Sequence, residues 1–73
     1  MGKGRVLIVD DEEDLVELVR YNLEQEGFQV SSALDGESGI AAAFREIPDA
    51  IIIDLMLPGI DGLEVCRRLR NDA

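Results

Sequence analysis

Three aspartates stand directly after short apolar runs of the sequence. Asp10 and Asp11 follow the run Val6–Val9, and Asp54 follows the run Ala50–Ile53. Continuous runs of this kind are typical of strands buried in a parallel sheet, where ligand sites form beyond the carboxyl ends of the strands. If the two strands are neighbours, their backbones lie about 4.8 Å apart. The three carboxylates are then expected to meet at one place.

Such a group of carboxylates needs a counter-ion. At a separation of ~4 Å and an effective dielectric constant of ~20, each ionised pair repels by about 4 kcal/mol. The chain has no histidine and a single cysteine, Cys66, so the available ligands favour Mg²⁺ over zinc. Each acid alone has a structural explanation, because Asp11 suits a helix N-cap and Asp54 suits the start of a loop. The recurrence of acids after two separate apolar runs favours a shared metal site.

Helical periods separate the apolar runs. The first apolar stripe ends at Gly27, a glycine suited to a helix C-terminus, and it comprises Leu15, Val16, Val19 and Leu23. The second opens at Asp35-Gly36 and stops at Pro48, and it comprises Ile40, Ala43, Phe44 and Ile47. A third helix is expected from Asp61, which has capping-box spacing to Glu64, with Ile60 and Val65 placed as a hydrophobic staple.

The order of these elements predicts an α/β fold. Residues 28–31 alternate apolar and polar side chains, as an edge strand does, whereas residues 50–53 are expected to be buried on both faces. Strands that alternate with helices imply a parallel sheet with right-handed crossovers, here β-α-β-α-β-α.

Composition limits the classes of function. A chain of 73 residues makes one small domain, and its net charge of −9 should repel nucleic acid and anionic membrane surfaces. The longest apolar run near the N-terminus is too short for a signal peptide or a membrane span. Cys66 has no partner for a disulfide and lies at helical spacing from Leu63 and Leu69, so we interpret it as a small buried hydrophobe. These features predict a cytoplasmic protein.

Two segments together resemble the receiver domain of two-component response regulators. They are Val6–Glu12, with the sequence VLIVDDE, and Ile51–Gly62, with the sequence IIIDLMLPGIDG. The resemblance extends over residues 1–73 and implies a flavodoxin-like, doubly wound parallel sheet with strand order 2-1-3. It also implies that these are the first three strand–helix units of a receiver, with the last two absent. Tyr21–Glu24 and Leu63–Cys66 are similar to the subgroup joined to winged-helix DNA-binding domains.

The resemblance assigns a role to each acidic residue. Asp54 would be the phospho-acceptor, the nucleophile that takes a phosphoryl group from a sensor histidine kinase in a phosphorelay. Asp54, Asp11 and the backbone carbonyl of Met56 would bind Mg²⁺ directly, and Asp10 would act through a water. The full-length protein would control transcription, and the receiver is a signalling module rather than an enzyme in the ordinary sense. Pro58 and Gly59 would only shape the following loop.

The sequence departs from the family in its missing second half. An intact receiver supplies a Ser or Thr and a Lys to the phosphoryl group, whereas this chain has no threonine and its single lysine, Lys3, precedes the first strand. We therefore expect partial metal binding, impaired phosphotransfer and no conformational switch. A sheet of order 2-1-3 would also expose strand three as an edge, which predicts self-association or domain swapping through residues 51–53.

Two other functions compete with this interpretation. The first is a self-associating α/β scaffold without phosphotransfer activity, in which the acids only cap helices. The second is a phosphohydrolase that forms its own aspartyl phosphate. It is disfavoured because such enzymes usually space two aspartates as D-x-D after the first strand, whereas this chain has Asp10-Asp11-Glu12.

Overall fold

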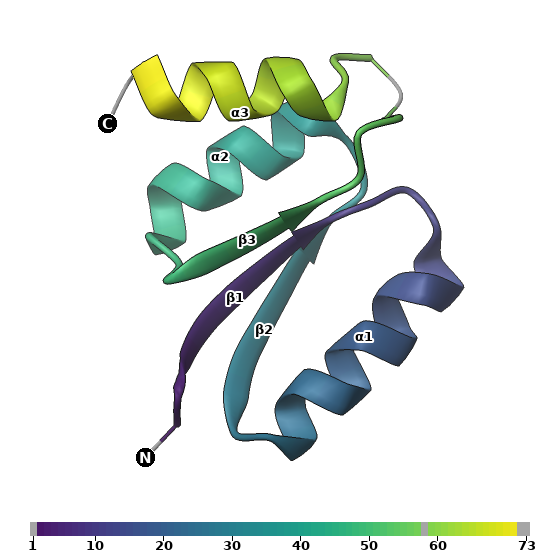
Figure 1. Ribbon diagram of the computed structural model, residues 1–73, viewed down its shortest axis with the longest axis vertical. Helices are drawn as coiled ribbons and strands as arrows, with labels where there is room; N and C mark the ends of the chain where they lie inside the picture. The colour runs from purple at the N-terminus through teal and green to yellow at the C-terminus, as the bar shows by residue number, and fades with distance from the viewer. Residues whose placement is uncertain (1, 58, 72–73) are drawn as a thin grey trace.

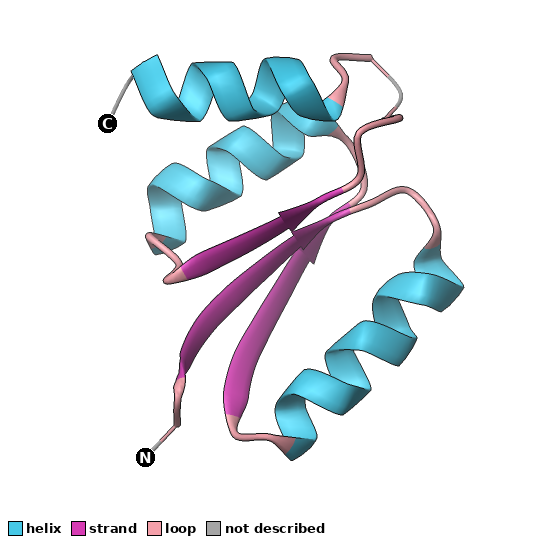
Figure 2. Ribbon diagram, in the orientation of Figure 1, coloured by secondary structure: helices cyan, strands magenta, loops and turns pink. Residues whose placement is uncertain are grey.

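Three parallel strands form one sheet, with one helix on one face and two on the other (Figures 1 and 2). The computed structural model describes residues 2–57 and 59–71. The elements in chain order are β1 (Gly4–Val9), α1 (Glu13–Gln25), β2 (Phe28–Ala33), α2 (Gly36–Glu46), β3 (Ala50–Ile53) and α3 (Gly62–Asn71). The strand order is β2-β1-β3. The predicted fold class and strand order are therefore confirmed.

The register places the ends of all three strands at one edge of the sheet. Val9, the last residue of β1, pairs with Ala33 of β2 on one side and with Ile53 of β3 on the other. The ladder continues one residue further, because Asp10 donates its N–H to the Ala33 carbonyl and Asp54 donates its N–H to the Val9 carbonyl. We call this the carboxyl edge of the sheet.

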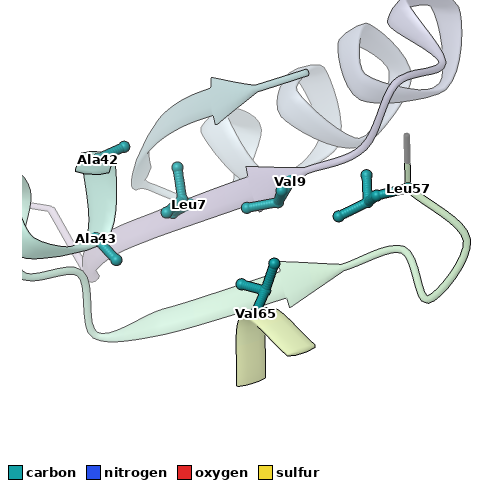
Figure 3. Close-up of a cluster of buried hydrophobic side chains, with 6 residues drawn as sticks. All are labelled: Leu7, Val9, Ala42, Ala43, Leu57 and Val65. Carbon is teal, nitrogen blue, oxygen red and sulfur yellow. The ribbon is translucent and has the colours of Figure 1, made fainter. Parts of the chain in front are cut away.

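Apolar side chains fill both sides of the sheet. The larger cluster lies between the sheet and the helices α2 and α3 (Figure 3), and its buried members are Leu7, Val9, Ala42, Ala43, Leu57 and Val65. The smaller cluster lies under α1 and consists of Val6, Ile8 and Val16. Because β1 contributes to both clusters, its continuous apolar run is explained by burial on both faces.

The face that α2 buries differs from the predicted stripe. Ile40 and Ala43 pack inward as predicted, but Phe44 is exposed, and Ile47 is 79% exposed and forms the left-handed C-cap of the helix. Small residues instead let α2 approach the sheet closely. A Cβ atom added at Gly39 would lie 2.8 Å from both methyl groups of Val9.

The helix starts confirm two predicted caps and correct a third. Asp35 accepts the N–H of Ser38, and Asp61 accepts the N–H of Glu64. The prediction that Asp11 caps the first helix is wrong, because the N-cap residue is Glu12 and its side chain makes no capping bond. Pro58, predicted to shape the loop before α3, lies outside the described residues. None of the helices in the described ranges has the length and apolar character needed to cross a bilayer.

Strand β3 is less buried than its composition predicted. Ile51 and Ile53 pack against the larger cluster. Ile52 faces the other side of the sheet, next to Ile8, and is 46% exposed. The prediction of burial on both faces is wrong for Ile52, because α1 packs against β2 and leaves this part of the sheet uncovered.

The two outer edges of the sheet differ in their protection. On β2, the guanidinium of Arg20 donates to the Val30 carbonyl at 2.8 Å and to the Ser32 hydroxyl at 2.7 Å. The carbonyls of Gly27 and Ala33 point toward β1, so by alternation the Val30 carbonyl points outward. A charged side chain bonded to an edge carbonyl blocks pairing with another strand. Among the described residues, β3 has no side chain bonded to its outer edge.

The close contact at Gly39 gives a test of the packing. Replacing a helical glycine by alanine normally favours the helix by about 1 kcal/mol. We expect Gly39→Ala to destabilise the protein instead, by about 1–3 kcal/mol, because its methyl group would press on the fully buried Val9 side chain. Urea unfolding followed by circular dichroism measures the effect. Ser38→Ala, on the exposed face of the same helix, is the control and should change stability by less than about 0.5 kcal/mol. Equal stability of the two variants would contradict the packing described here.

Candidate functional site

The carboxyl edge of the sheet holds a group of three acidic side chains. Carboxylate oxygens of Asp10, Glu12 and Asp54 all lie within 4.8 Å of one another. Asp10 and Asp54 are half-buried and Glu12 is exposed. Because the two aspartates follow neighbouring strands in register, their proximity is a direct result of the sheet topology.

Local hydrogen bonds fix the direction of two of these side chains. Asp10 accepts the N–H of Glu12 at 2.9 Å, and Asp54 accepts the N–H of Met56 at 3.0 Å. Each bond uses the Oδ1 atom of an aspartate and the backbone two residues later, as in an Asx turn. The second oxygen of each carboxylate makes no further hydrogen bond to the described residues.

The site differs from the predicted ligand set in one acid. Asp10 and Asp54 come together as predicted, whereas Asp11 is exposed and lies outside the three-carboxylate group. Glu12 takes that place, and sequence reasoning missed it because only Asp10 and Asp11 were assigned to the end of the first strand. The signal that could have found Glu12 is its spacing of two residues from Asp10. In an Asx turn the Asp10 side chain bonds to the backbone of Glu12, and this turn brings the Glu12 side chain toward the end of the strand.

The carboxyl edge carries no compensating positive charge among the described residues. No described ion pair involves Asp10, Glu12 or Asp54, and Lys3 lies at the opposite end of β1, where it pairs with Glu26 of the α1 C-terminus. The position of Lys3 was predicted and is confirmed. Three carboxylates without a basic neighbour repel one another and are relieved by a bound cation.

Exposed apolar side chains occur in the two segments that follow the acids. Met56 is 84% exposed, and Leu55 beside it is exposed as well. On α1, whose first turn follows Glu12, Leu15 and Leu18 are also exposed. Large apolar side chains exposed close together are typical of a protein contact surface.

This arrangement suits one kind of chemistry. The donor atoms are carboxylate oxygens with no nitrogen or sulfur ligand among them, which is the set that binds Mg²⁺ rather than zinc or copper. The residues therefore fit a hard divalent cation. A half-buried carboxylate held beside such a cation is also a nucleophile able to accept a phosphoryl group.

Comparison with known proteins identifies a sequence family. The profile of the response regulator receiver domain matches residues 6–73. The chain is 52% identical over 67 residues to the alkaline phosphatase synthesis transcriptional regulatory protein PhoP of Bacillus subtilis. That match covers 92% of this chain and 28% of PhoP, so the chain spans less than a third of this relative.

Solved structures agree with the sequence match. The response regulator TrrA of Thermotoga maritima, in complex with Mg²⁺ and BeF, superposes with a TM-score of 0.90 at 38% identity, covering 99% of this chain and 61% of that one. A second structure, of histidine kinase ThkA in complex with TrrA, matches with a TM-score of 0.90 at 37% identity, covering 100% of this chain and 61% of that one.

Proposed function

The chain belongs to the response regulator receiver domain family, and from this membership we propose that Asp54 is the phospho-acceptor of a two-component signalling pathway. Its phosphoryl donor is the phosphohistidine of a sensor histidine kinase. The observation that carries the proposal is the position of Asp54, which is hydrogen-bonded through its N–H to the end of β1 with its carboxylate beside that of Asp10. The match to 61% of TrrA supports the further proposal that residues 1–73 are the first three strand–helix units of a receiver.

The transfer exchanges one bond to phosphorus for another. A carboxylate oxygen of Asp54 forms the new O–P bond while the P–N bond to the kinase imidazole breaks, and the imidazole nitrogen keeps the electron pair and then takes up a proton. The product is an aspartyl phosphate, with one transfer per cycle and no turnover of a metabolite. The chain's own contribution is to fix the carboxylate, through the Met56 N–H, so that its second oxygen is available.

We propose that Asp54 and Asp11 bind Mg²⁺ directly together with the backbone carbonyl of Met56, and that Asp10 acts through a water. Asp10 and Asp54 already lie close together, and the complex of TrrA with Mg²⁺ and BeF supports the choice of metal. Bound Mg²⁺ would offset the negative charge of the carboxylates and of the incoming phosphoryl group. Asp11 is exposed and adjacent to Asp10 in sequence, so a turn of this short loop would carry it into the group in exchange for Glu12.

The proposed kinase contact includes the exposed apolar side chains that follow Asp54. Leu55 and Met56 are exposed apolar side chains directly after Asp54, and a kinase must approach Asp54 closely for the phosphorus to be transferred in line. The complex of ThkA with TrrA supports a histidine kinase as the partner. For the full-length protein we propose control of transcription, on the similarity to PhoP, and a cytoplasmic location.

We further propose that the 73-residue chain by itself transfers phosphoryl groups slowly. The described residues place no basic side chain at the carboxyl edge, so charge on the transferring group is offset by the metal and by backbone N–H groups alone. Loss of a single well-placed electrostatic donor typically lowers a rate by about 10²–10³-fold.

Exposure of β3 favours a second property, self-association. Ile52 is half-exposed on one face of β3, and no side chain in the described part of the chain protects the outer edge of this strand as Arg20 protects β2. Exposed apolar edge strands pair readily with strands of other chains. We propose that two copies of the chain associate through β3. The same contact would form the self-associating scaffold, a function that needs no phosphotransfer.

Incubation with a small phosphodonor tests the acceptor role. With acetyl phosphate and Mg²⁺, we expect the intact mass to increase by one phosphoryl group, in a base-labile adduct located on Asp54, because an acyl phosphate is cleaved by hydroxide. Asp54→Asn should give no adduct. Asp61→Asn is the matched control, since Asn caps a helix as well as Asp does, and should give the parental yield. An adduct that persists in Asp54→Asn would refute the assignment.

A magnesium titration tests the ligand set. Calorimetry should show that Asp54→Asn and Asp11→Asn each weaken Mg²⁺ binding by roughly tenfold, equivalent to about 1.4 kcal/mol, because each substitution removes a charged oxygen ligand. Glu12→Gln should weaken it less. If Glu12→Gln has the larger effect and Asp11→Asn has none, the metal uses the geometry seen in the structure and the assignment of Asp11 is wrong.

Sedimentation equilibrium tests self-association. We expect the parent chain to form dimers at micromolar concentration and Ile52→Lys to shift it to monomers, because the substitution places a charge in the buried contact. Leu18→Lys makes the same kind of change at an exposed position of α1, which packs against β2, and should leave the dimer intact. A folded parental monomer at this concentration would rule the association out.

A further inference from the structure

A polar hollow lies on the α2 side of the sheet, where β1 and β2 extend past the end of this helix (Figure 1). Its volume is about 200 Å³, and its lining includes Arg5, Gln29, Ser31 and Glu46. Leu7 packs under α2, and alternate residues of a strand share a face, so Arg5 points to the same side. Gln29 is paired with Arg5, and Ser31 is paired with Leu7. We call this site the β2–α2 hollow.

The β2–α2 hollow is separate from the acids and from the outer side of β3. It lies over β1 and β2, whereas the later strands of a flavodoxin-like sheet of order 2-1-3-4-5 are added beyond β3. It also lies at the amino-terminal end of the strands, opposite the carboxyl edge where Asp54 follows β3. Its surroundings are therefore formed by β1, β2 and α2, whose residues the structure describes.

Two opposite charges line the hollow without forming an ion pair with each other. The described ion-pair partner of Glu46 is Arg45, at 2.8 Å. The Ser31 hydroxyl, Arg45 and, from further away, the charge of Arg5 hold the pKa of the Glu46 carboxyl below its ordinary value. The backbone of Arg5 is fixed, because its N–H donates to Asp49 Oδ2 at 2.9 Å and its carbonyl accepts the Asp49 N–H. A ligand with one negative and one positive group can bridge the two side chains.

An exposed apolar residue stands at the rim of the hollow. Ile47 lines an adjoining hollow of about 400 Å³, which shares Arg5, Gln29 and Glu46 with the first. It is 79% exposed and has a left-handed backbone conformation with a φ of 49°. A β-branched residue is strained in this conformation, which glycine adopts freely, and such strain is typical of ligand sites. Because Ile47 adds so little to the core, its use is contact with an apolar group from outside.

We propose that the β2–α2 hollow binds a small zwitterion with an apolar side chain, of the chemical class of the free α-amino acids. The Arg5 guanidinium bonds the ligand carboxylate through two N–H groups. Glu46 accepts the ligand ammonium group, and the apolar side chain lies on Ile47. The first hollow is smaller than the roughly 300–1,000 Å³ of sites for drug-sized molecules, which suits a ligand of this size. The proposal is independent of the phospho-acceptor role of Asp54.

Leucine is the probe for this site, because it carries both charges and an apolar side chain. In heteronuclear NMR spectra of the 73-residue chain, we expect leucine to shift the amide signals of the residues that line the hollow. Isocaproate lacks the ammonium group and isoamylamine lacks the carboxylate, so each should bind roughly tenfold more weakly, through loss of one charged contact. Equal binding of either analogue, or no shifts with leucine, overturns the proposal.

Neutral variants test the two charged contacts. Arg5→Gln and Glu46→Gln should each weaken leucine binding roughly tenfold, since each removes one charge that the ligand needs. The matched controls are Lys3→Gln and Glu26→Gln, which break an ion pair at the same end of the sheet, outside both hollows. These controls should keep the parental affinity. Equal losses in the controls would mean that the ligand responds only to the general field of the chain, against the contacts proposed.

Ile47→Gly separates a ligand contact from a structural role. Glycine adopts the left-handed conformation without strain, so we expect the variant to be at least as stable in urea as the parent. Its affinity for leucine should nevertheless fall roughly tenfold, because the apolar contact is lost, while its weaker affinity for glycine as the probe stays unchanged. Undiminished leucine affinity would refute the contact with Ile47. A loss of both stability and affinity would assign Ile47 a structural role instead and refute it as well.

All of these measurements are made without Mg²⁺ or a phosphodonor. Their outcome is therefore separate from that of the acceptor and metal experiments on Asp54.

Discussion

The site depends on the parallel pairing of β1 with β3. The bond from the Asp54 N–H to the Val9 carbonyl continues this ladder past the end of β3, and the bond from the Asp10 N–H to the Ala33 carbonyl does the same on the other side of β1. Both aspartates therefore leave the backbone at one edge of the sheet. Successive side chains of a strand point to opposite faces, so slipping β3 by one residue would turn Ile51 and Ile53 out of the core. Core packing and site geometry are thus fixed by one register.

Most of the architecture could be predicted because its signals are local. A continuous β-branched run needs cover on both faces, which indicated a parallel sheet before any pairing was known. The boundaries also follow from single residues: Gly27 has the positive φ of a residue after a helix end, and Asp35 and Asp61 accept N–H bonds from the first turns of α2 and α3. The two aspartates of the site, Asp10 and Asp54, were accessible for the same reason, since they follow directly on the strands.

The features that sequence reasoning missed depend on contacts between elements. Glu12 joins the acids because the side chain of Asp10 bonds its N–H, so the helix starts one residue later than a cap at Asp11 would require. Helix α2 buries Gly39 instead of Phe44 because Val9 lies too close for any side chain between them. Ile52 is apolar like its neighbours, and it is exposed because α1 packs over β2 instead of over β3. The periodicity of the sequence does not indicate which strand a helix covers.

Charge links the local structure to function. The chain carries −9, and its described cations are mostly engaged away from the acids: Lys3 with Glu26, Arg20 with Glu17 and the β2 edge, Arg45 with Glu46, and Arg67 and Arg68 with Glu64. Among the residues that the structure describes, the three carboxylates at the carboxyl edge consequently have no ion-pair partner. A bound cation or the basic group of a binding partner would neutralise them, and either would make the site respond to what binds there. A carboxylate in that situation is suited to signalling, because the charge it carries changes when a cation, a phosphoryl group or a second protein arrives.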